Sequence, residues 1–204
     1  MNKKLFIFDL DGVLVEACDW HRDALNAALK ESYGYTISQH DHVTIFNGIP
    51  TSKKLQILTN MGVLPEDSHK KINDLKQEKT IEMIENNAYV REEKIEMIKE
   101  IKENNHIVCC YTNSIRKTAE LMLHKTGIKD MFEKILTNQD VSNPKPDPEG
   151  YKLLMLEFGI PSEHTYIIED SPKGIAAAEG SGANVIKVKN ADDVDITKIG
   201  RAHV

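Results

Sequence analysis

Short apolar runs that end abruptly at polar residues constrain the fold of this chain more than any other feature. The two clearest runs are residues 5–8 and 107–111, and further ones lie at 134–136, 166–168 and 184–188. Such runs are typical of parallel strands that are covered on both faces. Segments with helical spacing of apolar residues separate the later runs, and most of these segments end at a glycine. This alternation predicts an α/β fold with a parallel sheet and right-handed crossovers.

The segment between the first run and about residue 86 departs from this alternation. It contains helical patterns at about 19–30, 51–59 and 67–84, and it contains no strand-like run. The chain has 204 residues, more than the common single-domain size of about 100 to 150 residues. We therefore expect a core formed by residues 1–16 and 87–204, with an all-helical insertion at residues 17–86.

Charge and hydropathy exclude several classes of partner. The chain has 26 Lys and Arg against 32 Asp and Glu, a formal net charge of −6, which favours neither nucleic acid nor an anionic membrane. No apolar stretch is long enough to span a bilayer, and the first run is too short for a signal peptide. We therefore expect a cytoplasmic monomer whose partner is a small molecule.

Two aspartates follow the first apolar run directly. Asp9 and Asp11 are separated by one residue, and Gly12 after them allows the backbone to turn sharply. A carboxylate at the tip of a strand can attack phosphorus and form an aspartyl phosphate, which water then hydrolyses. An acidic turn of purely structural importance has the same pattern, so the pair indicates phosphate chemistry only together with other groups.

Three further groups lie where phosphate chemistry would need them. Residues 112–114, Thr-Asn-Ser, offer hydroxyls and backbone amides for phosphate oxygens, or they simply cap a helix. Lys145 lies between two prolines that fix the backbone, which favours a rigidly presented positive charge over an ordinary surface lysine. Glu169 and Asp170 supply oxygen ligands of the kind that Mg²⁺ prefers, or they are acidic residues that stabilise a helix start.

The carboxyl ends of parallel strands meet at one edge of a sheet, so these groups are expected to surround one ligand. Asp9, Asp11, Glu169 and Asp170 together carry a charge of −4, which Lys145 and one divalent cation would reduce to −1. Without the cation such a site would repel a phosphate dianion, so the hypothesis requires bound Mg²⁺. Protonation of Asp11 would remove the remaining charge and would provide a general acid for the leaving oxygen.

The order of these groups resembles the four motifs of the haloacid dehalogenase superfamily, specifically its phosphatase and β-phosphoglucomutase-like branch. The motifs read here as Asp9-x-Asp11-Gly12, Thr112-Asn113, Lys145-Pro146 and Glu169-Asp170. The resemblance covers nearly the whole chain and implies a Rossmann-like core with a helical cap inserted after the first motif. Dehalogenases and P-type ATPases of the superfamily lack an aspartate at the second motif position, so Asp11 favours chemistry on phosphate monoesters.

The resemblance also implies catalytic roles. Asp9 would be the nucleophile, and Asp11 would be the general acid and base. Thr112 and the backbone amide of Asn113 would bind the transferring phosphate. Lys145 would steady the charge of that phosphate, as both a catalytic and a substrate-binding residue.

The resemblance implies a Mg²⁺ site as well. The cation would be held by the Asp9 carboxylate, the Asp11 carbonyl and Asp170, with Glu169 as a further candidate ligand. All of these are oxygen donors, which Mg²⁺ prefers.

The insertion departs from the mutase pattern of the superfamily. Where β-phosphoglucomutases carry an arginine, residues 48–54 read Gly-Ile-Pro-Thr-Ser-Lys-Lys, and Ala17 stands where a threonine is often found. Both differences favour hydrolysis over the mutase reaction. Lys53 is a candidate contact for an anionic substrate, or it lies on a solvated helix face. His21 matches a histidine of many relatives, although a packed or solvent-facing histidine fits the same position.

The sequence therefore predicts a Mg²⁺-dependent phosphatase that hydrolyses a small phosphorylated metabolite, such as a sugar phosphate, through an aspartyl phosphate. The alternative enzyme is a hexose phosphate mutase that uses the same aspartyl phosphate. Two alternatives come from another class: a phospho-accepting signalling module, and a catalytically silent module that only binds metal. In signalling receivers the acidic pair precedes the hydroxyl and the lysine, whereas Glu169 and Asp170 come last here.

Overall fold

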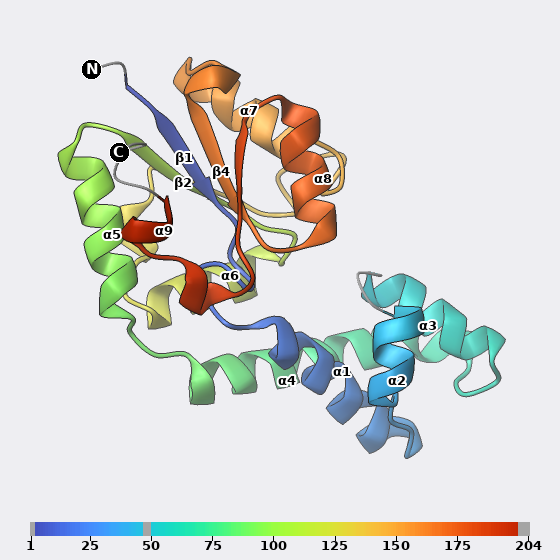
Figure 1. Ribbon diagram of the computed structural model, residues 1–204. Coiled ribbons are helices and arrows are strands. Elements are labelled where there is room, and N and C mark those ends of the chain that lie inside the picture. The colour runs from blue at the N-terminus through green and yellow to red at the C-terminus, as the bar shows by residue number, and fades with distance from the viewer. Residues whose placement is uncertain (1–2, 47–49, 200–204) are drawn as a thin grey trace. The chain divides into compact units, whose positions relative to one another are not determined.

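The computed structural model describes residues 3–46 and 50–199 (Figure 1). The chain divides into two compact units, one formed by Met1–Ala17 with Ala88–Val204 and the other by Cys18–Asn87. These boundaries lie one residue from those expected for the core and the insertion. That the second unit works as a cap domain stays a prediction.

A parallel sheet of five strands forms the centre of the first unit. Its order is β3-β2-β1-β4-β5, and every neighbouring pair is parallel. The strands are β1 (Leu5–Phe8), β2 (Ile107–Tyr111), β3 (Lys134–Leu136), β4 (Thr165–Glu169) and β5 (Asn184–Lys187). The central strand β1 is buried along its whole length, as its four apolar residues require. The predicted parallel α/β sheet is confirmed.

Helices cover both sides of this sheet (Figure 1). On one face, α7 (Glu149–Phe158) and α8 (Pro172–Ser181) bury side chains such as Leu154 and Ala177 against Leu5 and Ile7 of β1. On the other side lies α5 (Glu92–Glu103). The first unit also contains α6 (Arg116–Lys125), α9 (Ile196–Ile199) and short 3₁₀ turns at Lys129–Met131, Ser162–His164 and Ala191–Asp193.

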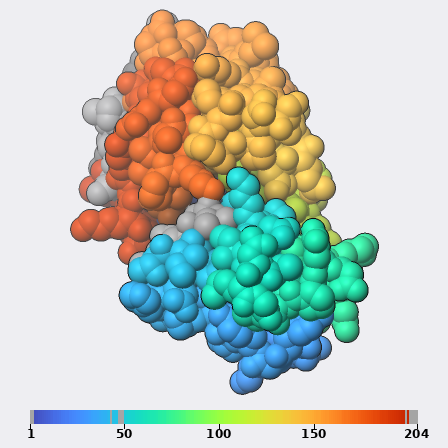
Figure 2. Space-filling view, turned by 90° about the vertical axis from the view of Figure 1, so that its right-hand side faces the viewer, coloured from blue at the N-terminus to red at the C-terminus, as the bar shows by residue number. Residues whose placement is uncertain are grey.

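Every regular element among the described residues of the second unit is helical. Its elements are α1 (Cys18–Tyr33), α2 (Gln39–Asp41), a π-helical turn at His42–Phe46, α3 (Thr51–Asn60), a 3₁₀ turn at Glu66–Ser68 and α4 (His69–Asn87). They share a core of their own, which includes Leu25, Phe46, Leu58 and Ile72. In Figure 2 the side chains of α3 and α4, coloured from cyan to green, pack against each other at the surface.

The sequence patterns missed the short elements between α1 and α3. A helix of three residues and one π-helical turn are much shorter than the window of about 11 residues over which the spacing of apolar residues reveals an amphipathic helix. Among the described helices, none combines the length and the apolar character that crossing a membrane requires.

Candidate active site

The carboxyl edge of the sheet gathers charged side chains from three separate parts of the chain. Asp9 follows β1, Glu169 ends β4, and the Lys145 ammonium lies between them. Lys145 Nζ donates to Asp9 Oδ1 over 2.7 Å, to Glu169 Oε1 over 2.6 Å and to the Tyr111 carbonyl oxygen over 2.7 Å. Asp9 and Lys145 are each 6% exposed, and Glu169 is fully buried. The cluster is therefore an ion network inside the protein.

The backbone around Lys145 is held by the side chain of Asn113. Asn113 Nδ2 donates to the Lys145 carbonyl over 3.0 Å, and Asn113 Oδ1 accepts from the Lys145 backbone N–H over 3.1 Å. The peptide bond between Lys145 and Pro146 is cis. At the end of the side chain, Lys145 Nζ lies 4.7 Å from the ring centre of Tyr111 and 5.2 Å from that of Tyr151. Aromatic faces at this range attract a cation, so both ends of Lys145 are fixed in place.

Burial and the neighbouring charges shift the pKa values of Lys145 and Asp9. Burial alone would lower the pKa of Lys145, but the carboxylates of Asp9 and Glu169 raise it well above its usual range, so Lys145 stays a cation. Burial raises the pKa of Asp9 well above its usual range; Glu169 adds to this effect and Lys145 opposes it. The ionised form of Asp9 would therefore gain from further positive charge nearby.

Both carboxylate oxygens of Glu169 accept hydrogen bonds. Its Oε1 accepts from the Tyr151 hydroxyl over 2.8 Å as well as from the ammonium. Its Oε2 accepts from the backbone N–H groups of Asp170 and Ser171 and from the Ser171 hydroxyl. A Cβ at Gly174 in α8 would lie 1.8 to 2.1 Å from the Glu169 carboxylate atoms, so only glycine fits there. Glu169 thus orients the network, and its oxygens are already engaged.

An all-oxygen cluster that shares Asp9 and Glu169 with this network fits a divalent cation. Asp9, Glu169 and Asp170 each offer a carboxylate oxygen, and these atoms all lie within 4.8 Å of one another. Asp170 Oδ1 is buried and has no hydrogen-bond partner among the described residues. Burial, with the Glu169 charge adding to it, raises the pKa of Asp170 to about 6. A buried oxygen without a hydrogen-bond donor is costly unless a ligand completes its environment, and a cation bound to Asp170 Oδ1 would do so.

Asp11 lies beside this cluster and is held by two hydroxyl groups. Its Oδ2 accepts from Ser114 Oγ over 2.8 Å and from Thr112 Oγ1 over 3.2 Å. The helix that follows, α6, has Ile115 as its N-cap residue, which makes no side-chain cap hydrogen bond, and its first backbone N–H, at Arg116, donates to Gln139 Oε1 over 2.8 Å. The side chains of residues 112–114 therefore do not cap α6. The hydroxyls of Thr112 and Ser114 donate to Asp11 instead.

Two predicted substrate contacts belong to the second unit. His21 Nδ1 in α1 lies 3.3 Å from Nζ of the buried Lys76 in α4, and Lys53 is exposed on α3. Their contact with substrate stays a prediction. Gly48 and Ile49 of the segment compared with mutases lie outside the described residues.

The sequence analysis gave no role to Tyr151 or Gly174, and it considered Ser114 only as part of residues 112–114, for phosphate oxygens or a helix cap. Tyr151 has the helical spacing of an ordinary core residue, and nothing in that spacing indicates its bond to Glu169. Gly174 does leave a signal, because a glycine in the first turns of a helix often marks a close approach of another group.

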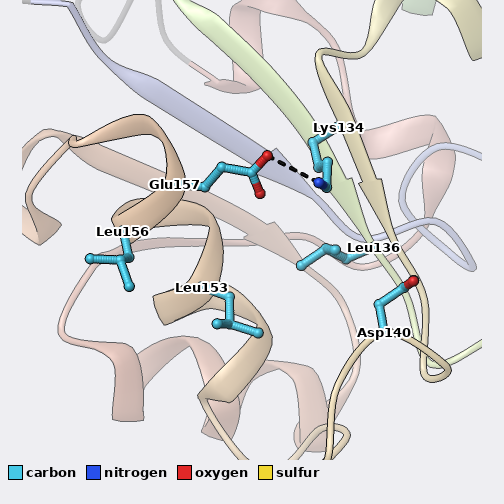
Figure 3. Close-up of a pocket in the computed structure, with 6 residues that line it drawn as sticks. All are labelled: Lys134, Leu136, Asp140, Leu153, Leu156 and Glu157. Atoms are coloured by element: carbon cyan, nitrogen blue, oxygen red, sulfur yellow. Dashed lines mark hydrogen bonds and ion pairs between the residues drawn. The ribbon is translucent and has the colours of Figure 1, made fainter.

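A separate hollow of about 420 Å³ lies between β3 and α7 (Figure 3). It is lined by Lys134, Leu136, Asp140, Leu153, Leu156 and Glu157. Lys134 Nζ and Glu157 Oε1 form an ion pair across it at 3.0 Å. Its lining includes no residue of the acidic cluster, so it plays no part in the site described above.

Comparison with known sequences finds a protein family and relatives that match most of this chain. The family described as haloacid dehalogenase-like hydrolase matches residues 6–188 of this chain. A phosphorylated carbohydrates phosphatase of Thermotoga maritima is 27% identical over 179 residues, which cover 86% of this chain and 80% of that protein. The fructose-1-phosphate phosphatase YqaB of Escherichia coli is 25% identical over 187 residues, which cover 90% of this chain and 95% of that protein.

Comparison with solved structures agrees on the fold. The crystal structure of a β-phosphoglucomutase from Clostridium difficile superposes with a TM-score of 0.78 and 20% identity, covering 99% of this chain and 97% of that one. The predicted fold class, a Rossmann-like α/β core with an inserted helical segment, is confirmed.

Proposed function

Because this chain belongs to the haloacid dehalogenase-like hydrolase family, we propose that it is a Mg²⁺-dependent phosphatase of a small phosphorylated metabolite. The observation that carries the proposal is the buried network in which Lys145 joins Asp9 and Glu169, beside the unpartnered oxygen of Asp170. Two relatives are named as phosphatases of phosphorylated carbohydrates and of fructose 1-phosphate. Their names support a sugar phosphate as the substrate class.

The residues that would hold Mg²⁺ are Asp9 and Asp170, together with the carbonyl of Asp11 that the family resemblance implies. When bound, the cation supplies positive charge that stabilises the Asp9 carboxylate and the oxygens of an entering phosphate. Glu169 is in the same cluster, but its two oxygens already accept hydrogen bonds. We therefore assign Glu169 to holding Lys145 and Asp170 in place.

In the first step Asp9 attacks phosphorus through a carboxylate oxygen and forms an aspartyl phosphate. The bond from phosphorus to the ester oxygen breaks, its electron pair stays on that oxygen, and Asp11 gives the oxygen a proton. Thr112 and the Asn113 backbone amide would bind the transferring phosphate. Lys145 keeps its charge throughout, so it holds Asp9 in position and offsets the charge of the phosphate.

In the second step Asp11, now a carboxylate, accepts a proton from water as the water oxygen attacks phosphorus. The bond from phosphorus to Asp9 breaks, the electron pair returns to the Asp9 carboxylate, and inorganic phosphate leaves. The helical insertion would act as a cap that excludes bulk water during the first step, with His21 and Lys53 as its candidate substrate contacts.

A panel of phosphate esters tests the proposal. The purified protein should release inorganic phosphate from at least one of fructose 1-phosphate, glucose 6-phosphate, glycerol 3-phosphate and phosphoglycolate, and from 4-nitrophenyl phosphate. Release should require Mg²⁺ and should stop when a chelator is added, because the metal-free cluster repels a phosphate dianion. An isomeric sugar phosphate formed without phosphate release would instead identify a mutase. No turnover of any ester would leave a silent or signalling module as the better account.

The raised pKa of Asp170 makes Mg²⁺ affinity depend on pH. In the metal-free protein Asp170 is protonated below about pH 6, and a proton on the carboxyl competes with the cation. The raised pKa of Asp9 acts in the same direction. The apparent Kd for Mg²⁺ should therefore weaken by about tenfold or more for each pH unit below 6.

Calorimetric titration with Mg²⁺ at several pH values between 5 and 8 measures this dependence. Glu163→Gln, which removes an exposed carboxylate outside the cluster, is the matched control and should follow the wild-type curve. Asp170→Asn should bind Mg²⁺ weakly throughout. Equal affinity at the two ends of the pH range would contradict the assignment of Asp170 as a ligand.

A further inference from the structure

Ser114 lies in the loop between β2 and α6, and its hydroxyl is directed at the carboxylate of Asp11. Ser114 Oγ donates to Asp11 Oδ2 over 2.8 Å, which is shorter than the 3.2 Å from Thr112 Oγ1 to the same oxygen. The backbone N–H of Ser114 donates to Thr112 Oγ1 over 2.9 Å. The three residues thus form a small network, in which Ser114 is bonded at both its backbone and its side chain.

The two hydroxyls cannot have the same role once a phosphate enters. Thr112 has one hydroxyl proton, and its oxygen already accepts from the Ser114 backbone. If Thr112 gives that proton to a phosphate oxygen, as the proposed function requires, it no longer donates to Asp11. Ser114 is then the hydroxyl of this network that still holds the Asp11 carboxyl.

We propose that Ser114 is a positioning residue that orients Asp11 as the proton donor of the first step. This inference rests on the proposed function, in which Asp11 is the general acid. Since Oδ2 accepts the Ser114 proton, the acidic proton of Asp11 is carried by Oδ1. It passes from Oδ1 to the ester oxygen as the bond to phosphorus breaks, and the electron pair of that bond stays on the ester oxygen.

If Ser114 positions the proton donor, the loss of kcat/KM on removing its hydroxyl depends on the leaving group. If Ser114 binds phosphate or only stabilises the fold, the loss does not depend on the leaving group. An alkoxide needs a proton as it leaves, but 4-nitrophenolate is a stable anion that leaves without one. The constant kcat/KM covers all steps up to departure of the leaving group, so it is the quantity to compare. We expect Ser114→Ala to lower kcat/KM by about 10- to 100-fold for an alkyl phosphate and by less than about threefold for 4-nitrophenyl phosphate.

The experiment uses 4-nitrophenyl phosphate and the alkyl phosphate of the panel that the wild-type enzyme hydrolyses with the highest kcat/KM. Ser114→Thr keeps a hydroxyl at this position and should recover most of the activity on the alkyl phosphate. Asp11→Asn should show the same selectivity between the two esters as Ser114→Ala. Ser162→Ala, in the turn before β4, is the matched control and should leave both constants unchanged.

Equal losses on both esters in Ser114→Ala would overturn the inference, because they would indicate phosphate binding or a structural defect. Unchanged kcat/KM on both esters would overturn it too, because Asp11 would then be oriented without Ser114. Failure of the proposed function has a different signature: the wild-type enzyme itself would hydrolyse neither ester.

Discussion

Asp9→Asn is expected to reduce phosphate release by at least about 10⁴-fold, which is the scale of loss when a catalytic nucleophile is removed. An amide oxygen does not attack phosphorus to form an acyl phosphate, so the first step has no alternative route. The fold should survive, because asparagine has the size of aspartate and its amide oxygen can accept from Lys145 Nζ. Burial already raises the pKa of Asp9, so a neutral side chain is tolerated there without metal.

Phosphate release from the best panel substrate and the thermal midpoint Tm together measure this prediction. Asp130→Asn removes an exposed carboxylate in a turn away from the site, and it should keep wild-type activity. A folded Asp9→Asn protein that retains more than a few per cent of wild-type turnover would exclude Asp9 as the nucleophile.

Lys145→Met is expected to damage both stability and activity. The ammonium is the shared cation of Asp9 and Glu169, and methionine would leave these buried carboxylates facing each other. Loss of one partner from a buried ion pair typically costs about 3 to 5 kcal/mol. The activity should fall by about 10² to 10³-fold, because the site loses the charge that offsets the phosphate.

The pH dependence of the stability loss separates this cause from a simple packing defect. As the pH falls, Asp9, whose pKa is already raised, takes up a proton, so the repulsion in Lys145→Met decreases. Urea unfolding should therefore show a smaller difference from wild type at about pH 5 than at about pH 8. Lys134→Met is the matched control. It removes an ion pair whose lysine side chain is 40% exposed, and it should cost less than about 1 kcal/mol. A loss for Lys145→Met that does not change with pH would contradict the electrostatic explanation.

The sequence predicted best those parts of the fold that are buried on all sides. The bounds of β1 and β2 agree with the apolar runs, because a central parallel strand has no polar face that could blur the pattern. The bounds of the edge strand β3 agree as well, although β3 is only partly buried. The ends of helices are less well defined by periodicity. The pattern at about 67–84 begins before α4, because Glu66–Ser68 forms a 3₁₀ turn first.

The candidate site was predictable in composition but not in its contacts. Placement at strand ends suggested that Asp9 and Glu169 lie together, and the flanking prolines and the order of the motifs added Lys145 to them; the three side chains do lie together. The bonds that orient them come from tertiary packing, such as the Tyr151 hydroxyl on Glu169 and the Ser114 hydroxyl on Asp11. A single sequence carries no periodic signal for contacts of this kind. The catalytic and metal-binding roles of these residues stay predictions.

Chemical trapping of the enzyme during turnover asks most directly whether Asp9 becomes phosphorylated. Borohydride reduces an acyl phosphate to an alcohol, so it would convert a phosphorylated aspartate to homoserine. After a rapid quench in the presence of Mg²⁺ and substrate, mass spectrometry of the peptide that contains residue 9 should show homoserine at that position. The Asp9→Asn protein and the wild type without substrate should show none. Substrate turnover with an unmodified Asp9, or with the modification at another carboxylate, would contradict the account.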